Sequence, residues 1–191
     1  MSTILDSPAG TRVEPTVYAG FWIRFGAAFL DFVITLPLLI VSSYFLSWSP
    51  DFTLYLGVVV ISMLYKPLTE GAFSATPGKR LLKLRVRKGD GSPIDYGDAF
   101  VRWVPWAVPY AVSVLFASQL FALPGYGETD SFVEMASMMQ RHQEEIGTLQ
   151  SLSNWSQLVP LVSALLIFFD ARKQAAHDKL ADTFVVQLES D

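Results

Sequence analysis

The stretch FWIRFGAAFLDFVITLPLLIVSSYFL, residues 21–46, decides the fold. It is almost wholly apolar, and at a rise of about 1.5 Å per residue about 20 such residues cross the roughly 30 Å hydrocarbon core of a bilayer. A cleavable signal peptide has a shorter apolar region, about 7–15 residues, that directly follows basic residues, whereas the single basic residue upstream here is Arg12. We therefore expect a retained transmembrane helix that follows a flexible tail over residues 1–18.

Three further apolar runs have nearly the length of a membrane span. We place these spans at residues 52–73, 99–123 and 152–169; prolines inside them are tolerated because neighbouring helices satisfy the freed carbonyl groups. The chain of 191 residues is 51% hydrophobic and 17% charged, against about 25% charged residues in soluble domains. The sequence thus predicts an all-α integral membrane protein with four transmembrane helices.

The basic residues predict how these helices are oriented. The loop 74–98 and the segment after the fourth span are rich in Lys and Arg, whereas the loop 124–151 has Arg141 alone. Because basic loops stay on the cytoplasmic side, we expect both termini and the loop 74–98 to be cytoplasmic and the loop 124–151 to be outside.

Both loops contain patterns of regular structure. Residues 81–87, before a turn at 88–93, and residues 183–188 are typical of short strands, so we expect them to pair in a small cytoplasmic β-ribbon. In the outer loop, Ser131 and Glu134 form a capping-box pattern ahead of apolar residues at helical spacing. This pattern predicts an amphipathic helix that lies on the membrane surface or caps the bundle.

The composition excludes several kinds of chemistry. The chain has no cysteine, which excludes disulfides, iron–sulfur clusters and a thiol nucleophile. Neither His142 nor His177 has a second residue at metal-ligand spacing. We therefore expect no enzyme activity, no metal and no cofactor.

A basic stretch from Lys79 to Lys88 holds six Lys and Arg residues. We interpret it as a determinant of topology that meets anionic lipid headgroups at the cytoplasmic face. The net charge of −4 argues against binding to nucleic acid.

Two charged residues, Arg24 and Asp31, lie inside the first span. A charge at the centre of a membrane helix costs about 2.5–3.5 kcal/mol on insertion scales, so such residues face the bundle interior or water. They are seven residues apart, on nearly the same helix face, but about 10.5 Å apart along the axis, too far to neutralise each other. Arg24 lies near the cytoplasmic end, where either Asp170 or Asp178 can reach it; Asp31 needs another partner, water or a proton.

Several short motifs occur in a fixed order along residues 19–188. They are Gly20-Phe21-Trp22-Ile23-Arg24-Phe25 with Asp31 seven residues on, Thr76-Pro77-Gly78-Lys79-Arg80, Arg102 at the start of the third span, and His177-Asp178-Lys179-Leu180-Ala181-Asp182-Thr183. Together they resemble the RDD family of bacterial membrane proteins. The resemblance implies a multi-pass protein of the bacterial inner membrane, and it implies that the arginine and two aspartates of the family name are Arg24, Asp31 and Asp178, with Asp170 as the other candidate for the third.

The chain departs from the family pattern in two places. Asp182 stands where the family has a small residue before the threonine, and the acidic outer segment is longer than in compact members. Members of the family look like transporters of ions or small solutes, and cation/proton exchange is associated with some of them.

Two functions follow from these observations. The first is a small membrane transporter, a homo-oligomer because four spans enclose little volume, in which Asp31 alternately binds a proton or a monovalent cation. The alternative is a structural or assembly subunit in which the intramembrane charges fix helix packing and the basic loop docks to lipid or to a partner.

Overall fold

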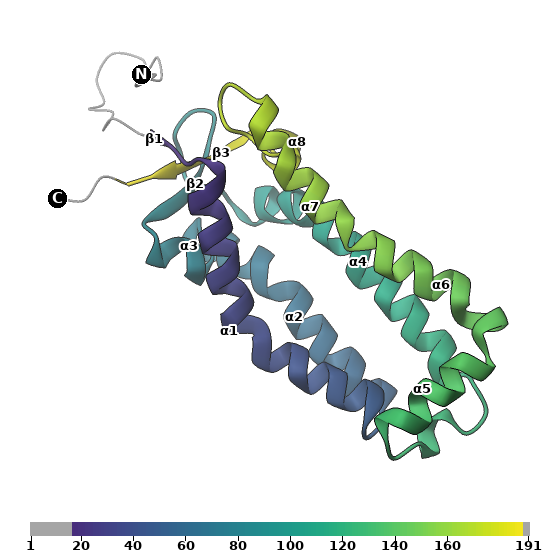
Figure 1. Ribbon diagram of the computed structural model, residues 1–191. Helices are drawn as coiled ribbons and strands as arrows, with labels where there is room; N and C mark the ends of the chain where they lie inside the picture. Colours follow the sequence, from purple (N-terminus) through teal and green to yellow (C-terminus); the bar gives the residue numbers. More distant parts are fainter. Residues whose placement is uncertain (1–16, 189–191) are drawn as a thin grey trace, which may run out of the picture. The chain divides into compact units, whose positions relative to one another are not determined.

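A computed structural model describes residues 17–188, and these contain four helices long and apolar enough to cross a membrane (Figure 1). They are α1 (Phe21–Ser47), α2 (Phe52–Phe73), α4 (Tyr96–Phe121) and a fourth over Gln143–Phe169, which comprises α6 (Gln143–Ser156), α7 (Leu158–Leu165) and the 3-10 helix η2 (Leu166–Phe169). The expectation of four long apolar helices, each able to span a membrane, is confirmed.

Two helix starts differ from the expected positions. α4 begins at Tyr96 rather than at 99, because Asp98 N–H donates to Asp95 Oδ1 (3.0 Å) while Asp95 N–H donates to Asp98 Oδ2 (2.9 Å), a reciprocal cap that satisfies the first free amides of a helix. α6 begins at Gln143, so the expected loop 124–151 ends nine residues earlier. The first turns of α6 are polar, so the apolar run of the sequence does not indicate that the helix begins at Gln143 and continues to Ser156.

The amphipathic pattern expected in the loop 124–151 forms α5 (Phe132–Arg141), after a short 3-10 helix η1 (Tyr126–Glu128). Ser131 caps α5 by accepting a hydrogen bond from Glu134 N–H at 3.3 Å, as its capping-box pattern predicts.

A small antiparallel sheet has the strand order β1-β3-β2. The stretches expected to pair, 81–87 and 183–188, do pair, as β2 (Leu84–Lys88) and β3 (Thr183–Gln187), in a register that places Val86 opposite Val185. The first strand begins three residues later than expected because Leu81 ends a short helix. The expectation of a flexible tail is wrong for Val17 and Tyr18, which form strand β1 and pair with the other edge of β3. The rest of that tail, residues 1–16, lies outside the described residues.

Two short helices complete the fold, α3 (Pro77–Leu81) and α8 (Ala176–Leu180). Each is followed by a residue in the left-handed backbone region directly before a strand, Lys83 (φ 56°) before β2 and Asp182 (φ 46°) before β3. Glycine adopts this conformation without strain, whereas Lys83 and Asp182 each carry a side chain there.

The chain forms two compact units. Among the described residues, the first comprises 17–34, 66–104 and 162–188, and its core packs Ala27 of α1 with Leu84, Val86 and Val185 of the sheet. The second comprises residues 35–65 and 105–161. Its core includes Tyr126, whose hydroxyl donates to the Leu46 carbonyl at 2.6 Å.

Candidate functional site

Five charged side chains from five helices meet in the first unit, and we call them the charge cluster. They are Arg24 of α1, Glu70 of α2, Lys79 of α3, Arg102 of α4 and Asp178 of α8. Buried charges are tolerated when they are paired and hydrogen-bonded, so their meeting ties these five helices to one another.

Arg102 is the centre of the charge cluster. Its side chain is fully buried, and its Nε donates to Glu70 Oε2 at 3.0 Å. Its Nη1 donates to Asp178 Oδ1 at 2.5 Å and also to Thr183 Oγ1 at the start of β3. One guanidinium therefore holds both buried carboxylates.

Each carboxylate has a second cation on its other oxygen. Lys79 Nζ lies 2.5 Å from Glu70 Oε1, and Arg24 Nη1 bonds Asp178 Oδ2. Arg24 and Lys79 are each 12% exposed, whereas Glu70, Arg102 and Asp178 are not exposed at all. The charges thus alternate in sign along a line whose two ends reach the surface of the unit.

Arg24 also fixes the backbone around it. Its Nε donates to the Ala19 carbonyl at 2.9 Å, and its Nη2 donates to the Lys173 carbonyl at 2.6 Å. The side chain at the start of α1 thereby holds the segment that leads into α8.

Asp178 is held in its ionised form. Burial alone raises the pKa of a carboxyl, but the positive charges of Arg102 and Arg24 outweigh this effect and keep the pKa of Asp178 well below its usual range. The Ala175 N–H also donates to Asp178 Oδ2 at 3.0 Å, which anchors the first turn of α8.

The neighbouring His177 is buried and neutral near pH 7. Its Nδ1 lies 3.0 Å from Ser163 Oγ, and its Nε2 lies 3.5 Å from Asp178 Oδ1. Burial lowers the pKa of His177 well below its usual value, and the nearby charge of Asp178 does not compensate.

Asp31 occupies a separate position, against the start of α3. Its Oδ2 accepts from Thr76 Oγ1 at 2.5 Å, and its Oδ1 accepts from Gly78 N–H at 2.8 Å. Thr76 is itself the N-cap of α3 and accepts from Lys79 N–H at 3.3 Å. A Cβ at Gly78 would clash with the Ala27 carbonyl and with Asp31, so the close approach of α3 to α1 requires glycine.

The structure thus separates the residues singled out from the sequence. Arg24 and Asp178 contact each other, and Lys79, Arg102 and Thr183 join them. Arg24 and Asp31 bind different partners.

Asp170, the other candidate partner of Arg24, lies 2.5 Å from Lys179 instead. It also accepts from the backbone N–H groups of Arg172 and Gln174, at 2.9 and 3.1 Å. These contacts shape the turn before α8.

The sequence profile of the RDD family matches residues 18–182 of this chain. The chain belongs to the RDD family. It is 33% identical over 98 residues to a Bacillus subtilis (strain 168) protein named "Uncharacterized protein YckC", a match that covers 50% of this chain and 63% of that protein. No solved structure matches the chain.

In this RDD family chain, Glu70 is the member of the charge cluster that sequence reasoning does not select as a site. The signal was present, because Glu70 is an acidic residue within an apolar run, one helical turn after Lys66. Gln174 was also missed; its Nε2 donates to the Thr183 carbonyl at 3.0 Å and so supports the residue that Arg102 bonds.

Two lysines of the basic stretch make ion pairs within the protein. Lys79 belongs to the charge cluster, and Lys88 lies 2.9 Å from both Asp95 and Asp98, at the cap of α4. Within residues 17–188, no group of three or more His, Cys, Asp or Glu residues is placed to hold a metal ion.

Proposed function

We propose that this RDD family protein is a small membrane transporter in which the charge cluster is the gate for a monovalent cation exchanged against a proton. One observation carries the proposal: each buried carboxylate lies between Arg102, which is fully buried, and one cation that is partly exposed. A shared carboxylate keeps one partner when it releases the other. Charges inside a membrane protein are also expensive and typically functional.

The exchange takes place at the exposed ends of the cluster. A monovalent cation that reaches Asp178 replaces Arg24, while Arg102 holds the other carboxylate oxygen. Since Arg24 also bonds the Lys173 carbonyl, its withdrawal loosens the attachment of α8. The same exchange at Glu70 displaces Lys79 and loosens α3.

Asp31 remains the predicted proton-binding carboxylate of the transporter. Its two oxygens accept from Thr76 and Gly78, so a proton on Asp31 weakens the contact that holds α3, the helix that carries Lys79. Proton binding at Asp31 and cation binding at Glu70 are thereby coupled through one short helix.

The same proposal includes the orientation of the protein in the membrane, its contact with lipid and its oligomeric state. The distribution of Lys and Arg favours both termini on the cytoplasmic side of a bacterial inner membrane, where the basic stretch meets anionic lipid headgroups. Between 6% and 22% of the most apolar stretch of each candidate span is buried inside the chain, which leaves surface for other copies and supports a homo-oligomer in which several chains build the passage.

A second function is supported by the contacts of the carboxylates. Both Asp31 oxygens and all four carboxylate oxygens of Glu70 and Asp178 have partners, whereas among the described residues Arg102 Nη2 is buried without a hydrogen-bond partner. Carboxylates bonded at both oxygens are held rigidly. This favours a structural or assembly subunit, in which the charges only fix the helix ends.

An ion-flux assay separates the two functions. The protein is reconstituted in vesicles, a sodium or potassium gradient is imposed, and internal pH is followed with a dye. The wild type should move protons, whereas Glu70→Gln, Asp178→Asn and Asp31→Asn should not, although they insert equally well. Glu128→Gln, at an exposed carboxylate outside the charge cluster, is the matched control and should behave as the wild type.

The result that would contradict the transporter is a wild-type protein that is correctly folded in vesicles and moves no protons with either cation. The structural alternative predicts that outcome, together with loss of folded protein in Glu70→Gln and Asp178→Asn.

A further inference from the structure

Each of the four candidate spans contains a proline close to the point where the chain passes from one compact unit to the other. The chain changes unit after residues 34, 65, 104 and 161. The prolines within three residues of these points are Pro37, Pro67, Pro105 and Pro160. The limits of the units follow from contacts in space, whereas the prolines are given by the sequence. Their coincidence in all four spans therefore marks a common feature of the fold.

A proline weakens a helix at a defined turn. It has no amide hydrogen, so the carbonyl four residues earlier loses its helical partner, and the proline ring crowds that carbonyl. In these spans the carbonyls concerned are those of Val33, Met63, Val101 and Ser156. Helices bend sharply at prolines, and the fourth span is interrupted near its proline, at Gln157 between α6 and α7. Each of the four connections between the units thus contains a turn that bends more easily than an intact helix.

The first unit is held together by polar contacts of its own. All members of the charge cluster belong to it. Asp31 belongs to it as well, together with its partners Thr76 and Gly78. Paired buried charges resist separation, because the loss of one partner leaves the other charge unpaired. These contacts join the ends of α1, α2 and α4 to α3 and α8 in one body.

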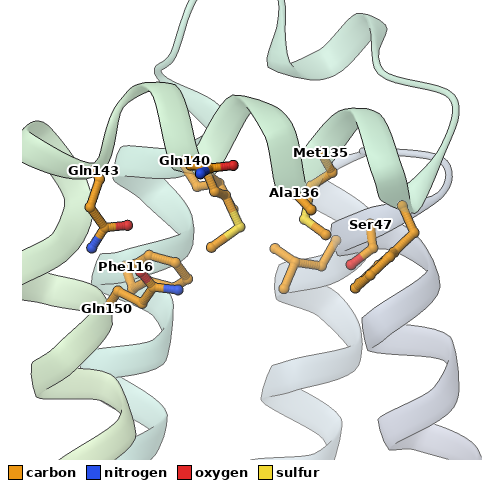
Figure 2. A pocket seen from close by; sticks show the side chains of 11 residues that line it. Ser47, Phe116, Met135, Ala136, Gln140, Gln143 and Gln150 are labelled. Carbon is orange, nitrogen blue, oxygen red and sulfur yellow. The ribbon is translucent and has the colours of Figure 1, made fainter.

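The second unit also has contacts of its own between different helices. Ser113 Oγ of α4 lies 3.3 Å from Ser153 Oγ of α6, and Tyr55 of α2 shares a hydrophobic cluster with Ala117 of α4. Residues of α1, α4, α5 and α6 line one groove beneath α5 (Figure 2). All the residues of these contacts belong to the second unit. This unit is therefore a second body, joined within itself.

We propose that the four proline-containing turns form a hinge at which the first unit moves as a body relative to the second. Compact units of one chain move relative to each other unless a large apolar interface holds them, and hinges are short segments that absorb the change in backbone angles. In a transporter of the kind proposed above, this movement opens and closes access to the charge cluster. That use rests on the proposed function, whereas the hinge itself does not.

Distances between spin labels on the full chain in vesicles test the hinge. The chain has no cysteine, so the labels are attached to introduced ones at exposed positions. Asp90→Cys with Glu144→Cys joins the two units, and Asp90→Cys with Phe169→Cys lies within the first unit. The distance distribution between the units should be clearly broader than that within the first unit. No ion gradient is applied, so the result does not depend on whether the protein is a transporter.

Two prolines of α4 provide matched variants. Pro105 and Pro109 are both buried in the same helix, but only Pro105 lies at the change of unit. Pro105→Ala gives the Val101 carbonyl a helical partner again and should narrow the distribution between the units, whereas Pro109→Ala should leave it as in the wild type. Replacing all four hinge prolines with alanine should narrow it to the width found within the first unit.

The pair of labels within the first unit also reports whether each variant is folded. Pro37→Ala, at an exposed position of α1, repeats the test without disturbing buried packing if Pro105→Ala does not fold. The proposal is overturned if the wild-type distribution is as narrow between the units as within the first unit. It is also overturned if Pro109→Ala narrows the distribution as much as the folded hinge variants do, or if those variants leave it as broad as in the wild type.

Discussion

Arg102 determines whether the charge cluster is stable, because it is the partner that Glu70 and Asp178 share. Removing one member of a buried ion pair costs about 3–5 kcal/mol, since the other charge is left unpaired. Because Glu70 keeps Lys79 and Asp178 keeps Arg24, Arg102→Met should destabilise the protein by up to that amount in thermal or denaturant unfolding in detergent.

The matched control is Lys79→Met, which removes a partly exposed cation and leaves Glu70 bound to Arg102. It should have a clearly smaller effect than Arg102→Met. Equal unfolding midpoints for the two variants would mean that Arg102 is not the centre of the cluster.

His177 should make the protein sensitive to acid. Burial lowers its pKa in the folded state, while the unfolded chain takes up a proton at its ordinary pKa of about 6.5. The unfolded state thus binds more protons as the pH falls below about 6.5, and stability should decline by up to about 1.4 kcal/mol per pH unit.

The free energy of unfolding should keep falling with pH until His177 also takes up a proton in the folded protein. Unfolding midpoints measured from pH 7.5 to 4.5 test this dependence. His177→Gln should flatten the profile, and His142→Gln should retain it. If both variants lose stability at low pH to the same extent, groups other than His177 cause the acid sensitivity.

At the scale of the elements, α3 depends on its contact with α1. Gly78→Ala places a methyl group against the Ala27 carbonyl and Asp31, and overpacking of this kind costs about 1–3 kcal/mol. The variant should unfold at lower temperature than the wild type.

Gly57→Ala is the matched control in α2, where an added Cβ meets no atom within 4 Å. It should stabilise the protein by up to about 1 kcal/mol, because alanine favours helix over glycine. A Gly78→Ala variant as stable as Gly57→Ala would show that α3 does not pack closely on α1.

The turn before β2 carries strain that glycine removes. Lys83 has a φ of 56°, a conformation that costs most residues about 1–2 kcal/mol. Lys83→Gly should raise the free energy of unfolding by about 1 kcal/mol or less, since glycine also makes the unfolded chain more flexible.

Arg85→Gly provides the comparison, because it puts the same residue inside strand β2. There glycine should lower the stability by about 0.5–1 kcal/mol. Chemical denaturation of both variants measures the difference, and a destabilised Lys83→Gly would contradict the account of the turn.

For the whole molecule, the sequence predicts the spans best, because bilayer thickness sets their length and leaves few alternatives. It predicts β2 and β3 from their apolar alternation, but not β1, since two residues carry no periodicity. The start of α6 was misplaced because its polar first turns do not resemble the apolar run that follows.

The charge cluster could be predicted in part. Arg24 is found as a charge inside the first span, and the motifs point to Arg102 and Asp178, because these residues stand in short patterns that can be compared. Glu70 is not found, since one acidic residue in an apolar run does not reveal which helix face is buried or which cations face it. Which carboxylate meets which cation is set by tertiary packing of five helices, and local sequence does not encode it.

The most direct test of the central claim is the labelling rate of a single cysteine at Ala175. The chain has no cysteine of its own, and Ala175 is 2% exposed beside Asp178. If cations displace Arg24 and loosen α8, sodium or potassium should speed maleimide labelling of Ala175→Cys in vesicles, while Val185→Cys, buried in the sheet, should stay unlabelled. Labelling of Ala175→Cys that is equally slow with and without these cations would contradict a gate at the charge cluster.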